Sequence, residues 1–102
     1  YTVPVGFTAF LKFYFMSAGA GTPDAVPAKI GRNVITVDPA APGVTDGNIF
    51  LSTRLVNDSI LQQDFGSAPI PIGTAGDVIK MAVTPSAGAA QTWRGTMIIV
   101  LR

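Results

Sequence analysis

Glycine and proline interrupt this chain at short intervals along its whole length. It has 11 glycines and 8 prolines in 102 residues, and turn-forming residues recur roughly every 8–12 residues. No stretch between them places apolar residues at the i, i+3, i+4 and i+7 spacing of a capped amphipathic helix. This punctuation predicts one all-β domain over residues 1–102, an antiparallel β-sandwich of about seven to eight short strands.

The segments between these turns have the composition of strands. We expect strands at residues 7–17, 29–37, 48–56, 60–65, 78–84 and 92–101, and an extended edge at 66–72, where two prolines bar a central strand. Simple alternation divides the first strand between two partly apolar faces. One face then carries Phe7, Ala9, Leu11, Phe13 and Phe15, and the other carries Thr8, Phe10, Lys12, Tyr14 and Met16.

Two turns and a closing hairpin follow from local residue types. Asp46-Gly47 is typical of a tight turn in which glycine supplies a positive φ, and Gly73 to Asp77 predicts another turn. The strands at 78–84 and 92–101 are joined by the small-residue loop 85–90, and we predict that they pair as a hairpin.

The surface of such a domain is short of charge. Hydrophobic residues make up 48% of the chain and charged residues 13%, which is about half the charged share of an average soluble domain. In the last strand Ile98 and Val100 lie opposite the face of Met97, Ile99 and Leu101, so both faces are apolar. We therefore predict a homo-oligomer whose subunit contacts lie near Phe10, Tyr14, Met16, Ile98 and Val100.

Catalytic chemistry has few residues to draw on. The chain lacks His, Cys and Glu, which removes the commonest general base, zinc ligands and thiol nucleophile. A pair made of a serine with Lys12, Lys29 or Lys80 remains formally open, although solvated lysines are the preferred interpretation. The six aspartates stand at expected turns or strand ends, where an Asx-turn explains them: Asp24, Asp38, Asp46, Asp58, Asp64 and Asp77. We predict no enzyme, no catalytic residue, no metal and no cofactor.

Several other ligands and partners are also unexpected. Asp38, Asp46 and Asn48 could offer oxygens to calcium, but their spacing does not match an EF-hand loop, so turns are preferred. The net charge of +1 comes from scattered residues with no basic run, which argues against nucleic acid.

No apolar run reaches the length of a membrane span, so no membrane partner is expected. The start at Tyr1, without an initiator Met or a basic signal region, indicates a processed chain or a piece of a longer one.

Aromatic residues raise one alternative function. Phe7, Phe10, Phe13, Tyr14 and Phe15 crowd the first strand and Trp93 begins the last. A sugar-binding platform needs exposed, coplanar rings, whereas alternation divides these rings between two faces. Carbohydrate or receptor binding through the loops 18–28 and 85–90 stays open as the alternative to adhesion.

Both ends of the chain resemble known proteins. The opening Tyr1-Thr2-Val3-Pro4-Val5-Gly6-Phe7-Thr8-Ala9 resembles the "TVPAGKTA" entry of small β-sandwich proteins in tailed-phage virions. The closing Gly76-Asp77-Val78-Ile79-Lys80-Met81-Ala82-Val83 and Trp93-Arg94-Gly95-Thr96-Met97-Ile98-Ile99 resemble the hairpin of jelly-roll modules, including trimeric ones. The resemblance implies a jelly-roll-like bacteriophage virion structural protein. Its setting would be capsid decoration or cement, or a fibre or tail module. Its partners would be major capsid, fibre or tail subunits and further copies of itself, and the jelly-roll resemblance implies a trimer.

Overall fold

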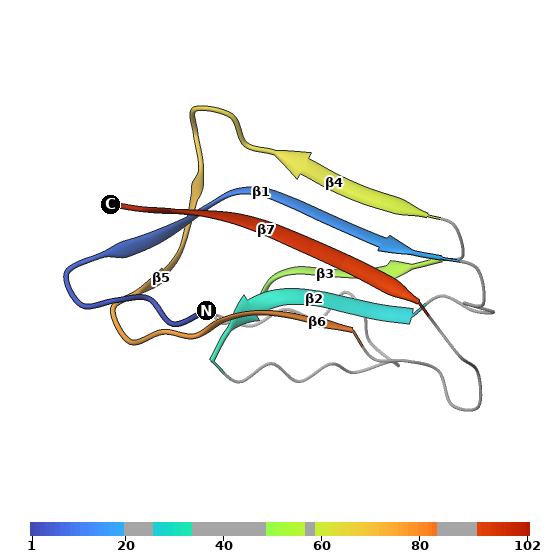
Figure 1. Ribbon diagram of the computed structural model, residues 1–102, viewed down its shortest axis with the longest axis horizontal. Coiled ribbons are helices and arrows are strands. Elements are labelled where there is room, and N and C mark those ends of the chain that lie inside the picture. The colour runs from blue at the N-terminus through green and yellow to red at the C-terminus, as the bar shows by residue number, and fades with distance from the viewer. Residues whose placement is uncertain (20–25, 34–48, 57–58, 84–91) are drawn as a thin grey trace.

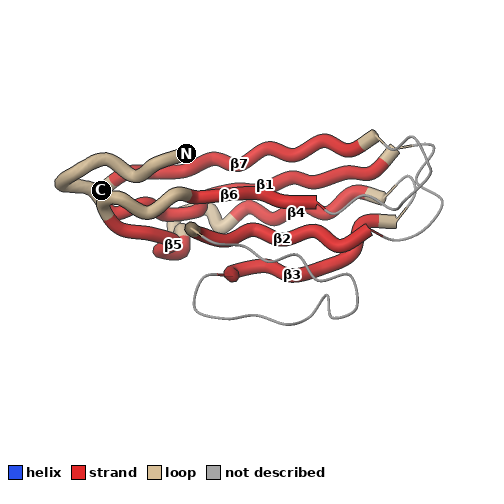
Figure 2. Tube along the Cα trace, turned by 90° about the horizontal axis from the view of Figure 1, so that it is seen from below, coloured by secondary structure: helices blue, strands red, loops and turns tan. Residues whose placement is uncertain are grey.

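The computed structural model describes residues 1–19, 26–33, 49–56, 59–83 and 92–102. These residues form seven strands and no helix, in two antiparallel sheets whose long strands run along the long axis of the molecule (Figures 1 and 2). The described segments thus contain no helix that could span a membrane. The strands are β1 (Thr8–Ala18), β2 (Val26–Arg32), β3 (Ile49–Leu55), β4 (Ile60–Asp64), β5 (Ile70–Thr74), β6 (Ile79–Val83) and β7 (Trp93–Leu101).

The long strand β1 organises the larger sheet. It pairs with β7 along one side, and with β5 and then β4 along the other. The smaller sheet has the order β3-β2-β6. The core draws on both sheets, which lie as two layers around it. Its buried side chains are Val3, Ala9, Leu11, Tyr14, Met16, Ala18, Ala28, Ile30, Leu55, Ile72 and Ile79.

A β-bulge at Lys12 reverses the alternation of β1. Leu11 pairs with Ile99, but the next pair along β7 is Phe13 with Ile98, so Lys12 is the extra residue. Ala9 and Leu11 point into the core before the bulge, and the buried positions are even-numbered after it, at Tyr14, Met16 and Ala18. The predicted faces of this strand are therefore correct only as far as Leu11. Beyond it they are wrong, because the bulge turns Phe13 and Phe15 outward and Tyr14 and Met16 inward.

Each predicted strand segment contains a strand, with shifts at the ends. The second strand begins earlier than expected, at Val26, and it ends at Arg32 because Asn33 takes a positive φ of 58°. The predicted edge segment becomes a strand only from Ile70 onward. The Asp46-Gly47 turn and most of the loops 18–28 and 85–90 lie outside the described residues.

The predicted hairpin between the last two strands is wrong. β6 pairs with β2 in the smaller sheet, and β7 pairs with β1 in the larger one. The lengths supply a physical reason, because β6 has 5 residues whereas β1 has 11 and can match all 9 residues of β7. The apolar inner side of β7 is confirmed, since Met97, Ile99 and Leu101 pack against the core.

The turn between β5 and β6 is held by Asp77. Its carboxylate accepts hydrogen bonds from the Asn33 side-chain amide at 2.8 Å and from the Thr74 backbone N–H at 2.9 Å. The Asn33 side-chain oxygen in turn accepts from the Val78 backbone N–H at 2.9 Å. Gly76 has a φ of 89°, which its lack of a Cβ permits. The turn predicted at Gly73 to Asp77 is confirmed, and it joins the larger sheet to the smaller one.

Candidate functional site

The outer side of the larger sheet carries a row of apolar side chains that the core does not cover. We call it the phenylalanine face, and it comprises Phe10, Phe13, Phe15, Ile60, Ile98 and Val100. The register of β1 with β7 places these side chains side by side, because Phe10 lies opposite Val100 and Phe13 lies opposite Ile98. The three phenylalanines are half-buried, whereas Ile98 is 47% exposed and Ile60 is 65% exposed. These side chains form a surface suited to contact with another protein.

Three charged groups lie at the edges of the phenylalanine face, and half-buried Lys12 stands between Phe10 and Phe13 along β1. The Arg102 guanidinium lies over the Phe10 ring, 5.2 Å from its centroid, as in a cation–π contact. Asp64 is the β4 partner of Phe13, on the side of β1 away from β7, and exposed Arg94 lies near the start of β7. An apolar centre with a charged rim is the arrangement of a protein–protein interface.

The structure divides the predicted interface residues into two groups. Phe10, Ile98 and Val100 belong to the phenylalanine face, so they remain candidates for subunit contacts. Tyr14 and Met16 belong to the core of this chain, with 6% and 0% exposure, so their assignment to an interface is corrected. The cause is the Lys12 bulge, which also brings Phe13 and Phe15 to the surface in their place. The residue types around Lys12 do not predict this bulge.

Tyr14 has a structural role in its inward position. Its hydroxyl donates to the Gln63 side-chain oxygen at 3.4 Å, and its ring lies 6.3 Å from that of Phe65, measured between centroids. Partial burial raises the pKa of the Tyr14 phenol above its ordinary value because the charged form loses hydration. This neutral, packed phenol helps to hold β4 on β1.

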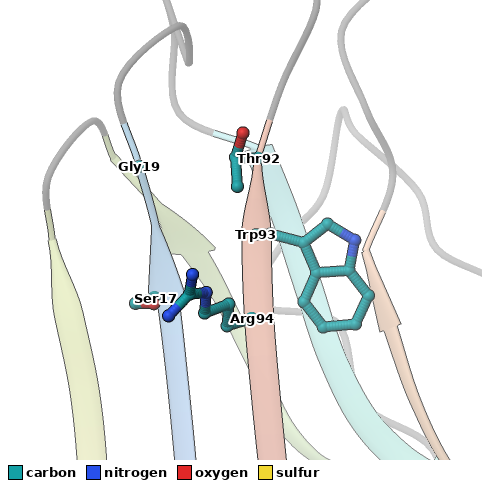
Figure 3. A pocket seen from close by; sticks show the side chains of 5 residues that line it. All are labelled: Ser17, Gly19, Thr92, Trp93 and Arg94. Carbon is teal, nitrogen blue, oxygen red and sulfur yellow. The ribbon is translucent and has the colours of Figure 1, made fainter.

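A second feature is an open depression where β1 ends and β7 begins (Figure 3). It has a volume of about 230 Å³ and is lined by Ser17, Gly19, Thr92, Trp93 and Arg94. The two larger side chains diverge, since Arg94 extends over β1 toward Ser17 while Trp93 extends from the other side of β7 (Figure 3). A ring and a guanidinium placed in this way do not form one platform for a sugar.

The residues considered for catalysis do not gather into a site within the described segments. Asp64 and Asp77 are the aspartates described there, and each serves a turn, since Asp64 accepts from the Gly66 backbone N–H at 2.8 Å. No three metal-ligating side chains come together in that part of the chain. Lys29 was expected to be solvated, but it is only 2% exposed. Lys29 is engaged in an interaction and lies opposite Ser52 on β3, whose hydroxyl oxygen is buried.

The chain matches no family model, no curated protein and no solved structure.

Proposed function

We propose that this chain is a non-enzymatic structural protein of a bacteriophage virion, which binds neighbouring virion subunits through its phenylalanine face. Capsid decoration or cement, or a fibre module, would use such adhesion. The resemblance of residues 1–9 to the entry of small β-sandwich proteins in tailed-phage virions supports the setting. A jelly-roll-like arrangement of the two sheets is part of this proposal.

The phenylalanine face is the observation that carries the proposal. Its centre holds Phe13, Phe15 and Ile98, and burial of apolar surface releases about 25 cal/mol per Å² before the costs of association. A single small face binds weakly once those costs are subtracted. Repetition on a symmetric particle would multiply such contacts through avidity.

Carbohydrate or receptor binding is the second candidate function. The feature that favours it is Trp93, which is 43% exposed beside the depression at the end of β7. The divergence of Trp93 and Arg94 argues against a shared sugar site (Figure 3). Adhesion therefore explains more of the exposed apolar surface than glycan recognition does.

Binding to the parent particle tests the proposal. Purified wild-type chain should bind particles stripped of it, and Ile98→Asp should abolish binding because it places a carboxylate in the apolar face. Val5→Asp is the matched control, since Val5 is also aliphatic and β-branched, is 90% exposed and is not part of this face. Co-sedimentation and imaging of the particle provide the measurement. Equal binding of wild type and Ile98→Asp would refute the use of this face, and binding to a glycan array that Trp93→Ala abolishes would favour the second function.

A further inference from the structure

The strand β7 has one backbone edge that faces away from β1. Thr8 and Arg102 exchange two backbone hydrogen bonds, of 2.8 and 3.0 Å, and the Gly19 N–H donates to the Thr92 carbonyl at 2.9 Å. Even-numbered residues of this strand therefore bond to β1. Antiparallel ladders alternate, so the N–H and C=O groups of the odd-numbered residues point the other way. We call these the β7 edge: Trp93, Gly95, Met97, Ile99 and Leu101.

Among the described residues, β7 pairs with β1 alone. Exposed edges normally carry charges, prolines or bulges, or are kept short, because unpaired backbone groups invite another strand. The other outer strands of both sheets follow this rule. β4, β5 and β6 have 5 residues each, β5 contains Pro71, β6 contains Lys80, and the β3 ladder has a bulge.

The β7 edge has fewer of these protections, since its one charged residue, Arg94, lies at the start of the strand. It spans 9 residues, contains no proline, and has no charge between Arg94 and Arg102. The bulge in its ladder belongs to β1, so β7 itself is regular. An uninterrupted edge of this length is a site for strand addition.

The sequence of β7 is self-complementary in one antiparallel register. With a two-fold axis at Met97, Trp93 lies opposite Leu101 of the second copy and Gly95 opposite Ile99 of the second copy. The even-numbered residues then pair Arg94 with Val100 and Thr96 with Ile98, so no like charges are opposed. Moving the axis to Ile98 would place Arg94 opposite Arg102 of the second copy. Charge thus disfavours the register centred on Ile98, and the register centred on Met97 pairs all of β7 without opposing like charges.

We propose that two copies of this chain pair through their β7 edges in that register to form a closed dimer. The pairing joins the two four-stranded sheets into one continuous sheet across the two-fold axis. Each copy uses its β7 edge once, so association stops at two. The phenylalanine faces of both copies come to lie on the same side of the joined sheet and stay open to other partners. The dimer requires no virion protein, so it can be tested apart from the proposed function.

Size-exclusion chromatography with light scattering measures the first consequence. The wild type should have twice the 10.6 kDa mass of one chain at micromolar concentration. Thr96→Lys combined with Ile98→Lys opposes lysines across the axis and should weaken the dimer by about tenfold or more. Thr96→Lys combined with Ile98→Glu changes the same positions but opposes unlike charges, and it should remain dimeric. A wild-type monomer or trimer, or equal dissociation of the two folded double variants, would overturn the proposal.

Disulfide formation tests the register itself. The chain has no cysteine, so Thr96→Cys and Ile98→Cys each introduce a single thiol. An oxidised mixture of the two variants should give a cross-linked heterodimer, because non-hydrogen-bonded partners have Cα atoms about 4.5 Å apart, within disulfide range. Each variant alone should cross-link poorly, because the thiols of its two copies would then lie two residues apart along the paired strands. A dimer that persists in light scattering while the mixture fails to cross-link would place the contact elsewhere, for example on the phenylalanine face.

Discussion

The two halves of β1 follow opposite rules within one strand. Residues 8–11, before the Lys12 bulge, bury their odd-numbered side chains and pair with β5. Residues 13–18, after it, bury their even-numbered side chains, and residues 13–17 pair with β4. One extra residue therefore decides which side chains form the core and which remain outside.

The surface of the molecule depends on this difference. Before the bulge, the outward ring is Phe10, which the Arg102 guanidinium covers. After the bulge, Phe13 and Phe15 face outward beside Ile98. A regular strand that continued the first half would instead bury Phe13, Phe15 and Ser17 and expose Tyr14 and Met16. The bulge is thus what creates the apolar centre of the phenylalanine face.

Single-residue deletions should give the largest contrast between the halves. Deleting Phe15 reverses the faces of the residues that follow it, so Met16 would point outward and Ser17 inward, and cooperative unfolding should be lost. Deleting Lys12 keeps every other side chain on its present face, because Lys12 is the extra residue. Its main loss is the 2.8 Å bond from the Phe65 N–H to the Lys12 carbonyl, worth about 1–3 kcal/mol.

Thermal unfolding followed by circular dichroism distinguishes the two deletions. The Lys12 deletion should melt cooperatively at a lower temperature, and the Phe15 deletion should show no cooperative transition. If both unfold alike, the bulge is not the element that sets the faces of β1.

Alanine substitutions should show a smaller contrast of the same kind. Leu11 and Met16 lie on opposite sides of the bulge and have 1% and 0% exposure, so alanine at either should cost about 2–5 kcal/mol of unfolding free energy. Phe15→Ala should cost less, despite the larger side chain removed, because Phe15 is only half-buried in the monomer. Urea denaturation measures these unfolding free energies, at protein concentrations low enough to keep the chain monomeric. A greater loss of unfolding free energy for Phe15→Ala than for Met16→Ala would mean that Phe15, and not Met16, faces the core.

Strand positions could be predicted from the sequence because turns are local. Gly76 and Asp77, for example, make their turn with Thr74 close by, so residue type was sufficient to place the turn, although the Asn33 contact that reinforces it comes from far along the chain. Strand partners are not local. The pairing of β7 with β1, in place of β6, depends on ladder length across the whole chain, and nothing at residues 78–101 encodes it.

The candidate site divides in the same way. Ile98 and Val100 were identified correctly as outward because β7 alternates without interruption. Tyr14 and Met16 were assigned to the wrong face because the predicted in–out alternation was continued past Lys12. The residue type of Lys12 does not indicate a bulge. Pattern analysis holds along a regular strand and fails at the first extra residue.

The smallest of the expected effects is that of acid. Low pH should reduce the stability of residues 8–11 of β1 more than that of residues 13–18. The side-chain amide of Asn33, followed by the Thr74 N–H, holds the pKa of Asp77 below its ordinary value of 3.8, with a lesser contribution from the charge of Arg32. A depressed folded pKa means that the stabilisation is fully present above the unfolded value. It is lost as the pH falls below about 4 and through the folded pKa.

Hydrogen exchange can locate this loss along β1. Thr74 is the β5 partner of Thr8, so protonation of Asp77 weakens the end of the ladder that holds residues 8–11. Protection factors of these residues should fall between pH 5 and pH 3, roughly across the ordinary aspartate pKa, while those of residues 13–18 change less. Asp77→Asn should be loosened already at pH 5 and show little further change with acid. Equal loss of protection in both halves of the wild type would mean that the Asp77 turn does not hold one half of β1 in particular, and that the two halves open as one unit.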